Sequence, residues 1–359
     1  MKDLKQNIWF DAKIAIVLLV LLYFLTFCAK AKADDFSEAF ATIQALSADC
    51  ASMGNACVSA REFSSDLNPA LVAVTTSKDF KWGISPAYAS VNFKNGPDIQ
   101  GGSLSLSVAL PKGVLQLSYT GAGSNRHTDF AETDGILISS SLDFDSIQDF
   151  GIQYGIDIAK DLIKKGDKLY IGAGYTYSKS KILSDLAITI PMEEGDPIPM
   201  DFYLDSKSQS HTYTAGAVYV PVEKVSLGIA YSYTLTKTTN DTDIPVEIDS
   251  TPDEEKIRMN DLRIGASWKI TDKLMLAGDY RHAKVNGNNF DQYYTGAEYC
   301  FHEAFCVYGG IPDSGWSAGA GLYLEHGGIN VAYQYDPFKE IRDDFGKAKV
   351  FAVTGYLSF

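Results

Sequence analysis

Hydrophobic and polar residues alternate along most of the chain beyond residue 79. Residues 224–236 read KVSLGIAYSYTLT, and every second position from Val225 to Leu235 is hydrophobic or aromatic. The positions between them hold Ser, Gly, Ala and Thr. The same alternation occurs in residues 169–179 and 328–336. A period of two predicts β-strands with one apolar, aromatic face and one face of small and polar side chains.

The predicted strands are long and even in number. Several span 11–15 residues, whereas strands of soluble proteins usually have about 5–6 and strands that cross a bilayer about 9–11. Counted back from Phe359, fourteen strands are expected, at residues 80–93, 99–110, 113–122, 149–162, 166–184, 208–221, 222–238, 256–270, 271–285, 289–301, 305–312, 315–326, 327–336 and 347–359. The pattern predicts an all-β chain whose residues 80–359 form a 14-stranded antiparallel transmembrane β-barrel.

The connections between these strands alternate in length. Turns such as 111–113 and 271–272 are short, and the long connections fall on the opposite side, at 123–148, 185–207, 239–255 and 337–346. Short periplasmic turns and long outer loops are typical of bacterial outer-membrane barrels. The count requires residues 135–144 to belong to an outer loop and not to form a fifteenth strand.

The N-terminus has the features of an export signal. Three lysines, Lys2, Lys5 and Lys13, precede an apolar run at 14–27, and the sequence Ala-Lys-Ala follows at 31–33. This predicts a signal peptide over residues 1–33. A permanent N-terminal anchor, and a lipoprotein that uses Cys28, are the alternatives. Together with the barrel, the signal predicts localisation in the outer membrane of a Gram-negative-type bacterium, in contact with its lipid.

Net charge and cysteine content indicate which partners and which cross-links the protein can have. A net charge of −14 makes nucleic acid an unsuitable partner. Four cysteines follow the signal, and neighbour pairing predicts the disulfides Cys50–Cys57 and Cys300–Cys306. A zinc site is the rival interpretation, but neither pair has the usual ligand spacing.

Residues 34–79 are predicted to be a plug inside the barrel. A 14-stranded barrel has a lumen wider than its own side chains fill. The segment has a size suited to that space, with a helix expected near 35–48, a turn at Gly54 and a further turn at residues 68–70.

Part of this segment resembles a known family. The motif Met53-Gly54-Asn55-Ala56, then Phe63, then Asn68-Pro69-Ala70, is similar to the hatch of the FadL/TodX family of outer-membrane transporters for hydrophobic compounds. Residues 296–299, 309–310, 317–319 and 329–338 are more like its smaller PorV-type branch.

The resemblance implies that these hatch residues lie on a transport path for a fatty-acid-like or aromatic ligand, a hydrophobic small molecule. The PorV-like alternative implies a non-transporting scaffold or shuttle for a secreted or surface protein.

Two further stretches are candidates for contacts with partners. Residues 192–205 place apolar side chains among acidic ones, and either form an entry site or cap the barrel; the candidates are Ile198, Met200, Phe202 and Tyr203. The last strand ends on Phe359 with hydrophobic residues at alternate positions before it. Such an ending resembles the signal that the barrel-insertion machinery reads.

No constellation for chemistry is visible in the sequence. The five histidines are scattered and match no metal or catalytic spacing. His282 follows Asp279 and Arg281, and a solvated strand end is favoured there over a catalytic site. The acidic stretch 239–255 is interpreted as a solvated loop, with Ca²⁺ binding as the alternative. We therefore expect no enzyme activity, no cofactor and no metal.

Overall fold

The computed structural model describes residues 47–59, 67–74, 80–125, 127–133, 136–160, 166–190, 198–243, 254–339 and 341–359. The chain divides into two units, Met1–Ala41 and Thr42–Phe359, and every described residue belongs to the second. The predicted signal peptide and most of the helix expected near 35–48 therefore lie outside the described residues.

The described chain is built mainly of antiparallel strands. They are β1 (Trp82–Phe93), β2 (Ile99–Leu110), β3 (Gly113–Ser124), β4 (His127–Thr133), β5 (Ile136–Lys160), β6 (Lys168–Ile190), β7 (Ile198–Val222), β8 (Val225–Asp243), β9 (Glu254–Lys269), β10 (Leu274–Val285), β11 (Asn288–His302), β12 (Phe305–Ile311), β13 (Trp316–Leu324), β14 (Gly327–Tyr335) and β15 (Ala348–Ser358). Three short helices are α3 (Ala48–Ser52), α4 (Leu71–Val74) and α5 (Arg342–Phe345). No helix within the described ranges has the length and apolar character needed to cross a membrane.

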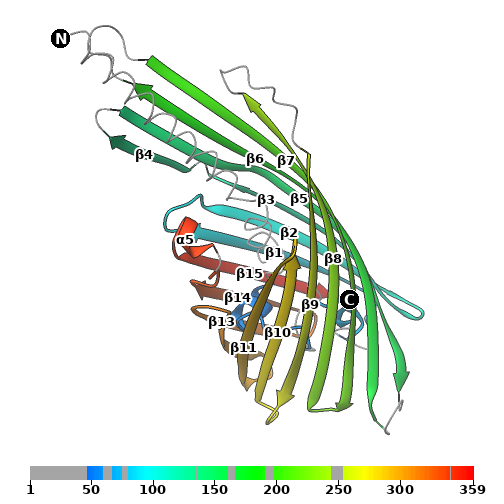
Figure 1. Ribbon diagram of the computed structural model, residues 1–359. Coiled ribbons are helices and arrows are strands. Elements are labelled where there is room, and N and C mark those ends of the chain that lie inside the picture. The colour runs from blue at the N-terminus through cyan, green and yellow to red at the C-terminus, as the bar shows by residue number, and fades with distance from the viewer. Residues whose placement is uncertain are drawn as a thin grey trace, which may run out of the picture. The chain divides into compact units, whose positions relative to one another are not determined.

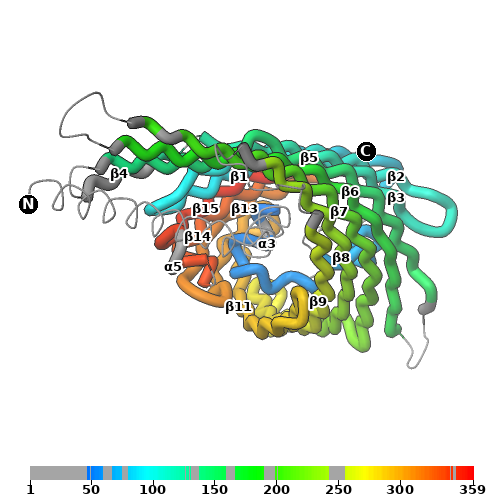
Figure 2. Tube along the Cα trace, turned by 45° about the horizontal axis from the view of Figure 1, so that its top comes forward, coloured from blue at the N-terminus to red at the C-terminus, as the bar shows by residue number. Residues whose placement is uncertain are grey.

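Fourteen of these strands form a closed ring (Figures 1 and 2). Each strand of the ring pairs with the next one along the chain, except that β3 pairs with β5, and β1 also pairs with β15. The pairing of β3 with β5 leaves β4 out of the ring, and β4 pairs instead with the first residues of β5. The predicted 14-stranded antiparallel barrel is confirmed.

The barrel wall is much taller on one side. Strands β5, β6 and β7 have 25, 23 and 25 residues, whereas β12 and β13 have 7 and 9. In Figure 1 the long strands continue past the rest of the ring, together with β4. The two sides of the barrel therefore differ in how far they reach beyond the short strands.

This tall side corrects the predicted loops at 123–148 and 185–207. Residues 136–144 form the first part of β5 and pair with both β4 and β6. Pairing of β6 with β7 is continuous from Lys168↔Val220 to Ile190↔Ile198. Alternation continues through Ser184, Leu186 and Ile188, so the strands keep pairing where the alternation of connection lengths predicted a loop.

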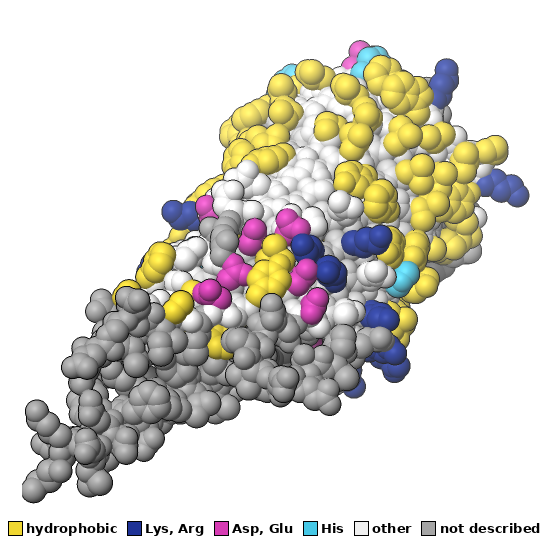
Figure 3. Space-filling model, turned by 90° about the horizontal axis from the view of Figure 1, so that it is seen from above, with side chains coloured by type: hydrophobic (Ala, Val, Ile, Leu, Met, Phe, Trp, Pro, Cys, Tyr) yellow, Lys and Arg dark blue, Asp and Glu magenta, His cyan; other side chains and the backbone are white. Residues whose placement is uncertain are grey.

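The alternating pattern separates the two faces of the wall as expected. On β8, Leu227, Ile229 and Tyr231 are each 45–46% exposed, whereas Ser226 and Ala230, at alternate positions, are buried. Figure 3 shows hydrophobic side chains gathered on one part of the surface, with a group of charged side chains beside them. The apolar, aromatic face is the outer surface of the barrel, which suits contact with lipid.

The chain's last residue completes the barrel seam. The rings of Phe359 and Trp82 stack with centroids 4.4 Å apart. The backbone N–H groups of Lys81 and Trp82 donate to the Phe359 carbonyl oxygen, at 2.7 and 3.1 Å. The terminal aromatic residue therefore helps to close β15 onto β1, while its recognition by insertion machinery stays a prediction.

Candidate functional site: the inner segment and the lumen wall

Residues 47–59 and 67–74, here called the inner segment, contact strands on opposite sides of the ring. Helix α3 contacts β12 to β15, and α4 contacts β3, β5 and β6. In Figure 2, α3 lies within the ring of strands. Contacts with opposite sides of a closed barrel place the inner segment in the lumen.

Hydrogen bonds fasten the first part of the inner segment to β13–β15. The Ala48 N–H donates to Thr354 Oγ1 at 2.8 Å, and Gln334 Nε2 donates to the Ala51 carbonyl oxygen at 2.8 Å. Ser317 Oγ donates to the carbonyl oxygen of Ser52 at 2.9 Å. Buried backbone groups at an irregular segment need such partners, and here the wall's small polar face supplies them.

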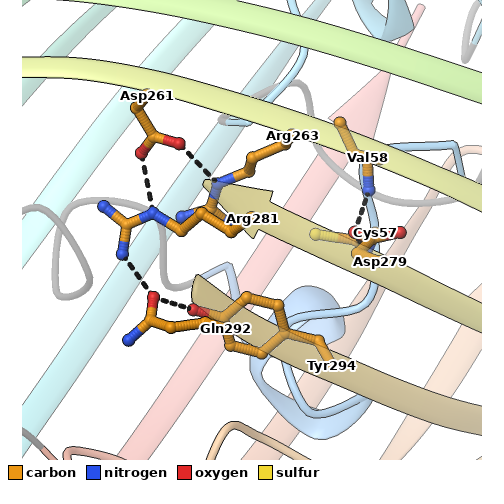
Figure 4. Close-up of polar contacts among 8 residues, drawn as sticks. All are labelled: Cys57, Val58, Asp261, Arg263, Asp279, Arg281, Gln292 and Tyr294. Carbon is orange, nitrogen blue, oxygen red and sulfur yellow. Dashed lines mark hydrogen bonds and ion pairs between the residues drawn. The ribbon is translucent and has the colours of Figure 1, made fainter. Parts of the chain in front are cut away.

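A buried carboxylate on β10 holds the middle of the inner segment (Figure 4). Asp279, which is 5% exposed, accepts hydrogen bonds from the N–H groups of Cys57 at 2.7 Å and Val58 at 2.8 Å. Hydrogen bonds to a charged acceptor are roughly twice as strong as those between neutral groups. Asp279 is thus a polar anchor for this part of the segment.

A charged network lies beside this anchor on β9–β11. Arg281 Nε donates to Asp261 Oδ2 at 2.8 Å, and Arg281 Nη1 donates to Gln292 Oε1 at 2.8 Å. Tyr294 Oη donates to the same Gln292 oxygen, and the Arg263 guanidinium lies 5.7 Å from the Tyr294 ring centre. Paired in this way, the ionised groups can stay buried without an uncompensated charge.

Asn68 fastens the second part of the inner segment to β7. Its Nδ2 donates to the Val58 carbonyl oxygen at 2.8 Å and to the Ala217 carbonyl oxygen at 3.2 Å. Its Oδ1 accepts the N–H of Ala70 at 3.1 Å, which fixes the turn through Pro69. Asn68, fully buried, therefore links both parts of the inner segment to the wall at β7 and β8.

Glycines in the wall let the inner segment lie directly against the strands. Gly296 and Gly310 are partners in the β11–β12 ladder, and a Cβ at either position would lie 2.3–2.4 Å from backbone atoms of Met53. Gly155 and Gly172 are partners on β5–β6, and a Cβ at Gly172 would lie 2.3 Å from the Pro69 carbonyl carbon. Because no other residue has room there, these glycines form seats for Met53 and Pro69.

The two predicted disulfides are present. Cys50 bonds to Cys57 within the inner segment, and Cys300 bonds to Cys306, its ladder partner across β11 and β12. Both belong to one apolar cluster with Met53 and Met275. Cys300 and Cys306 also lie near Glu298 in a group with metal-ligand spacing, but disulfide sulfurs are poor metal ligands because the thiolate is the binding form.

Comparison with solved structures identifies the architecture. The toluene transporter TbuX of Ralstonia pickettii is 12% identical with a TM-score of 0.53, and the match covers 88% of this chain and 97% of that one. The toluene transporter TodX of Pseudomonas putida is 13% identical with a TM-score of 0.55, covering 87% and 97%. A FadL homologue of Pseudomonas aeruginosa is also 13% identical with a TM-score of 0.55, covering 86% and 98%.

The chain has the fold of the FadL and TodX transporters. The predicted resemblance to that family is therefore confirmed in fold. Neither a family model nor a curated protein sequence matches the chain.

Most of the residues expected to form the hatch belong to the inner segment and contact the wall of the barrel. Met53 and Ala56 belong to the apolar cluster, and Gly54 and Asn55 turn the backbone with φ of +64° and +66°. Asn68, Pro69 and Ala70 contact β5–β8 as described above. Phe63 lies outside the described residues. The role of these residues in transport stays a prediction.

The expected entry residues are divided between two faces of β7. Phe202 is 8% exposed and lies on the face that continues the lumen wall, while Tyr203 is 42% exposed on the opposite face. Ile198 and Met200 are in the same strand, and their side chains lie outside the described part. An extended strand cannot gather adjacent residues on one side.

The neighbourhood considered for His282 does not form. Asp279 and Arg281 are buried toward the lumen, whereas His282 lies on the outer face and its Nδ1 is 2.8 Å from Asp291 Oδ1. Sequence reasoning also missed the anchoring role of Asp279. Its signal in the sequence was a carboxylate at an inward position of β10, between Ala277 and Arg281 on the same face.

Proposed function

We propose that the chain transports small hydrophobic molecules across the outer membrane, with the inner segment as its hatch. The observation that carries this proposal is the attachment of the inner segment to opposite sides of the lumen through Asp279, Asn68 and the wall glycines. A segment held by a few polar anchors and glycine seats can be displaced without unfolding the barrel, because the strands keep their own ladders.

The proposed path follows the inner face of β6–β8 toward their extended ends. From Gly216, which contacts Asn68, every second residue of β7 points to the same side. The next inward hydroxyls pair across β7 and β8 at 2.8–2.9 Å; the pairs are Ser208–Thr238, Ser210–Thr236 and Thr212–Thr234. Farther along, this face becomes apolar and buried at Leu186, Ile188 and Phe202. Paired hydroxyls and apolar side chains suit an uncharged ligand.

The proposed substrates are neutral hydrophobic compounds, of the monoaromatic or fatty-acid-like class. Support for the aromatic class comes from the solved structures of the same fold, which are described as toluene transporters and a monoaromatic hydrocarbon channel. The alternative of a PorV-like scaffold has no observation in its favour here.

Uptake in a Gram-negative host lacking its own hydrophobic-compound transporters tests the proposal. Cells that express the chain are expected to take up labelled toluene faster than cells with an empty vector. Changing both Asn68→Ala and Pro69→Ala is expected to lower uptake while the barrel stays heat-modifiable on gels. Gly309→Ala is the matched control, since a Cβ there meets only a Ser317 oxygen at 3.9 Å. Equal uptake by expressing and vector cells would contradict transport.

A further inference from the structure

A groove of about 470 Å³ lies on the outer surface of β9–β11. Its floor is a row of three small residues that are ladder partners, Ala266, Gly278 and Thr295. Bulky residues stand on the side toward the extended strand ends, where Ile264 is 46% exposed and Tyr293 is 66% exposed. The groove thus interrupts the apolar outer face with a depression three strands wide.

Gly278 leaves room for a side chain at the centre of this groove. A Cβ added there would meet only the Tyr294 carbonyl oxygen, at 3.8 Å. The neighbouring Asp279 points the opposite way, into the lumen, and accepts the N–H groups of the hatch. The groove and the hatch anchor therefore occupy opposite faces of one strand.

A charged side chain, Asp291, lies beyond one end of the groove. Beyond the paired rings of Tyr280 and Tyr293, whose centres are 5.2 Å apart, Asp291 accepts a hydrogen bond from Tyr280 and lies 2.8 Å from His282 Nδ1. Asp291 is exposed, with a side chain 53% accessible. The apolar part of the groove therefore matches the acyl chain of a lipid, and the exposed carboxylate at its end matches a polar headgroup.

We propose that this groove binds one acyl chain of a membrane lipid, whose hydrogen-bond-donating headgroup lies against Asp291. The proposal rests on the membrane location included in the proposed function, but not on transport. The occupant is a lipid chain because the exposed apolar surface around the groove must face acyl chains in a bilayer. Close packing, not the hydrophobic effect, provides the preference between a groove and bulk lipid.

Fluorescence quenching of Trp268 tests the proposal. Trp268 pairs with Leu276 in the ladder, one row from Gly278 and Ala266. The protein is produced without residues 1–33, which include Trp9, and carries Trp82→Phe and Trp316→Phe, so that Trp268 is the one remaining tryptophan. It is placed in phosphatidylethanolamine vesicles that contain the same lipid brominated on its acyl chains. Filling the groove by Gly278→Phe is expected to lower the binding constant of brominated lipid at Trp268 about threefold. Ala266→Leu fills it from the next strand and is expected to act in the same direction.

The matched control is Gly309→Phe, which adds the same side chain at another open position of the barrel wall. It is expected to leave quenching unchanged, with all variants remaining heat-modifiable. The headgroup is tested by brominated phosphatidylglycerol, which should bind about threefold more weakly than phosphatidylethanolamine, a difference that Asp291→Asn removes. Equal quenching in the parent and in both groove-filling variants would overturn the proposal. Failure of toluene uptake with the quenching differences intact would contradict transport and leave the lipid site standing.

Discussion

The two walls that hold the inner segment use different chemistry. On β9–β11 the lumen is charged, and the Asp279 carboxylate holds the N–H groups of Cys57 and Val58. On β5–β8, Gly172 lies against the backbone at Pro69, and the neutral side chain of Asn68 donates to the Ala217 carbonyl oxygen. Both sides also have a glycine seat. The difference shows that a lumen segment can be held by a charged acceptor on one side and by neutral hydrogen bonds and close contact on the other.

The largest effect is expected from adding a side chain at the glycine seat on β5–β6. Gly172→Leu places carbon atoms where the Pro69 and Ala70 backbone lies, so residues 68–70 must leave the wall. Overpacking of this kind costs about 3 kcal/mol. We expect the barrel to assemble and to pass small solutes in a liposome-swelling assay. Gly309→Leu is the control, and a sealed Gly172→Leu barrel would show that shape does not hold this side.

A somewhat smaller effect is expected on the charged side. Asp279→Asn keeps the size of the side chain but removes the charge that strengthens both hydrogen bonds, at a cost of about 1–3 kcal/mol. Leakage should rise, but less than in Gly172→Leu. Asp261→Asn is the comparison, since Asp261 pairs with Arg281. If Asp261→Asn leaks as much as Asp279→Asn, the network as a whole, and not the anchor, holds the segment.

Removing the wall disulfide should affect stability more than closure. The bond between Cys300 and Cys306 closes a short loop within an already paired hairpin, so Cys300→Ser with Cys306→Ser should cost about 2 kcal/mol. We expect a lower denaturation midpoint for the heat-modifiable form and an unchanged swelling rate. A leaking double variant would place the disulfide among the elements that hold the inner segment.

The smallest effect is expected at the surface ion pairs of the tall wall. Lys181 Nζ lies 3.5 Å from an Asp145 carboxylate oxygen and 3.8 Å from one of Asp205. Ion pairs in contact with water contribute little because solvent screens them. Lys181→Ala should therefore change neither the denaturation midpoint nor swelling beyond experimental error, and a clear loss of assembly would show that these charges help to order the extended strands.

The barrel could be predicted closely from the sequence because the alternation that marks each strand is a local pattern. Alternation along β8 separates lipid-facing Leu227 and Ile229 from inward Ser226 and Ala230, and each strand reports its own faces. The ladder Cys300↔Cys306 likewise follows from a hairpin of short separation.

The anchors were harder to foresee because they join distant parts of the chain. Asp279 meets Cys57 across 222 residues, and Asn68 meets Ala217 across 149. Contacts between such distant residues leave no periodic pattern in the sequence. The tall wall was not predicted because residues 123–148 and 185–207 were assigned to long outer connections, although strand pairing continues through 185–190 and 198–207.

The central claim, that the inner segment closes the barrel as a hatch, is tested most directly by electrical recording from single barrels in planar bilayers. Deleting residues 36–75 while keeping the predicted signal removes the inner segment and leaves every wall strand intact. The account predicts that the full chain is closed and that the deleted chain, still heat-modifiable, carries a steady ionic current. An assembled deletion variant that conducts no more than the full chain would contradict it.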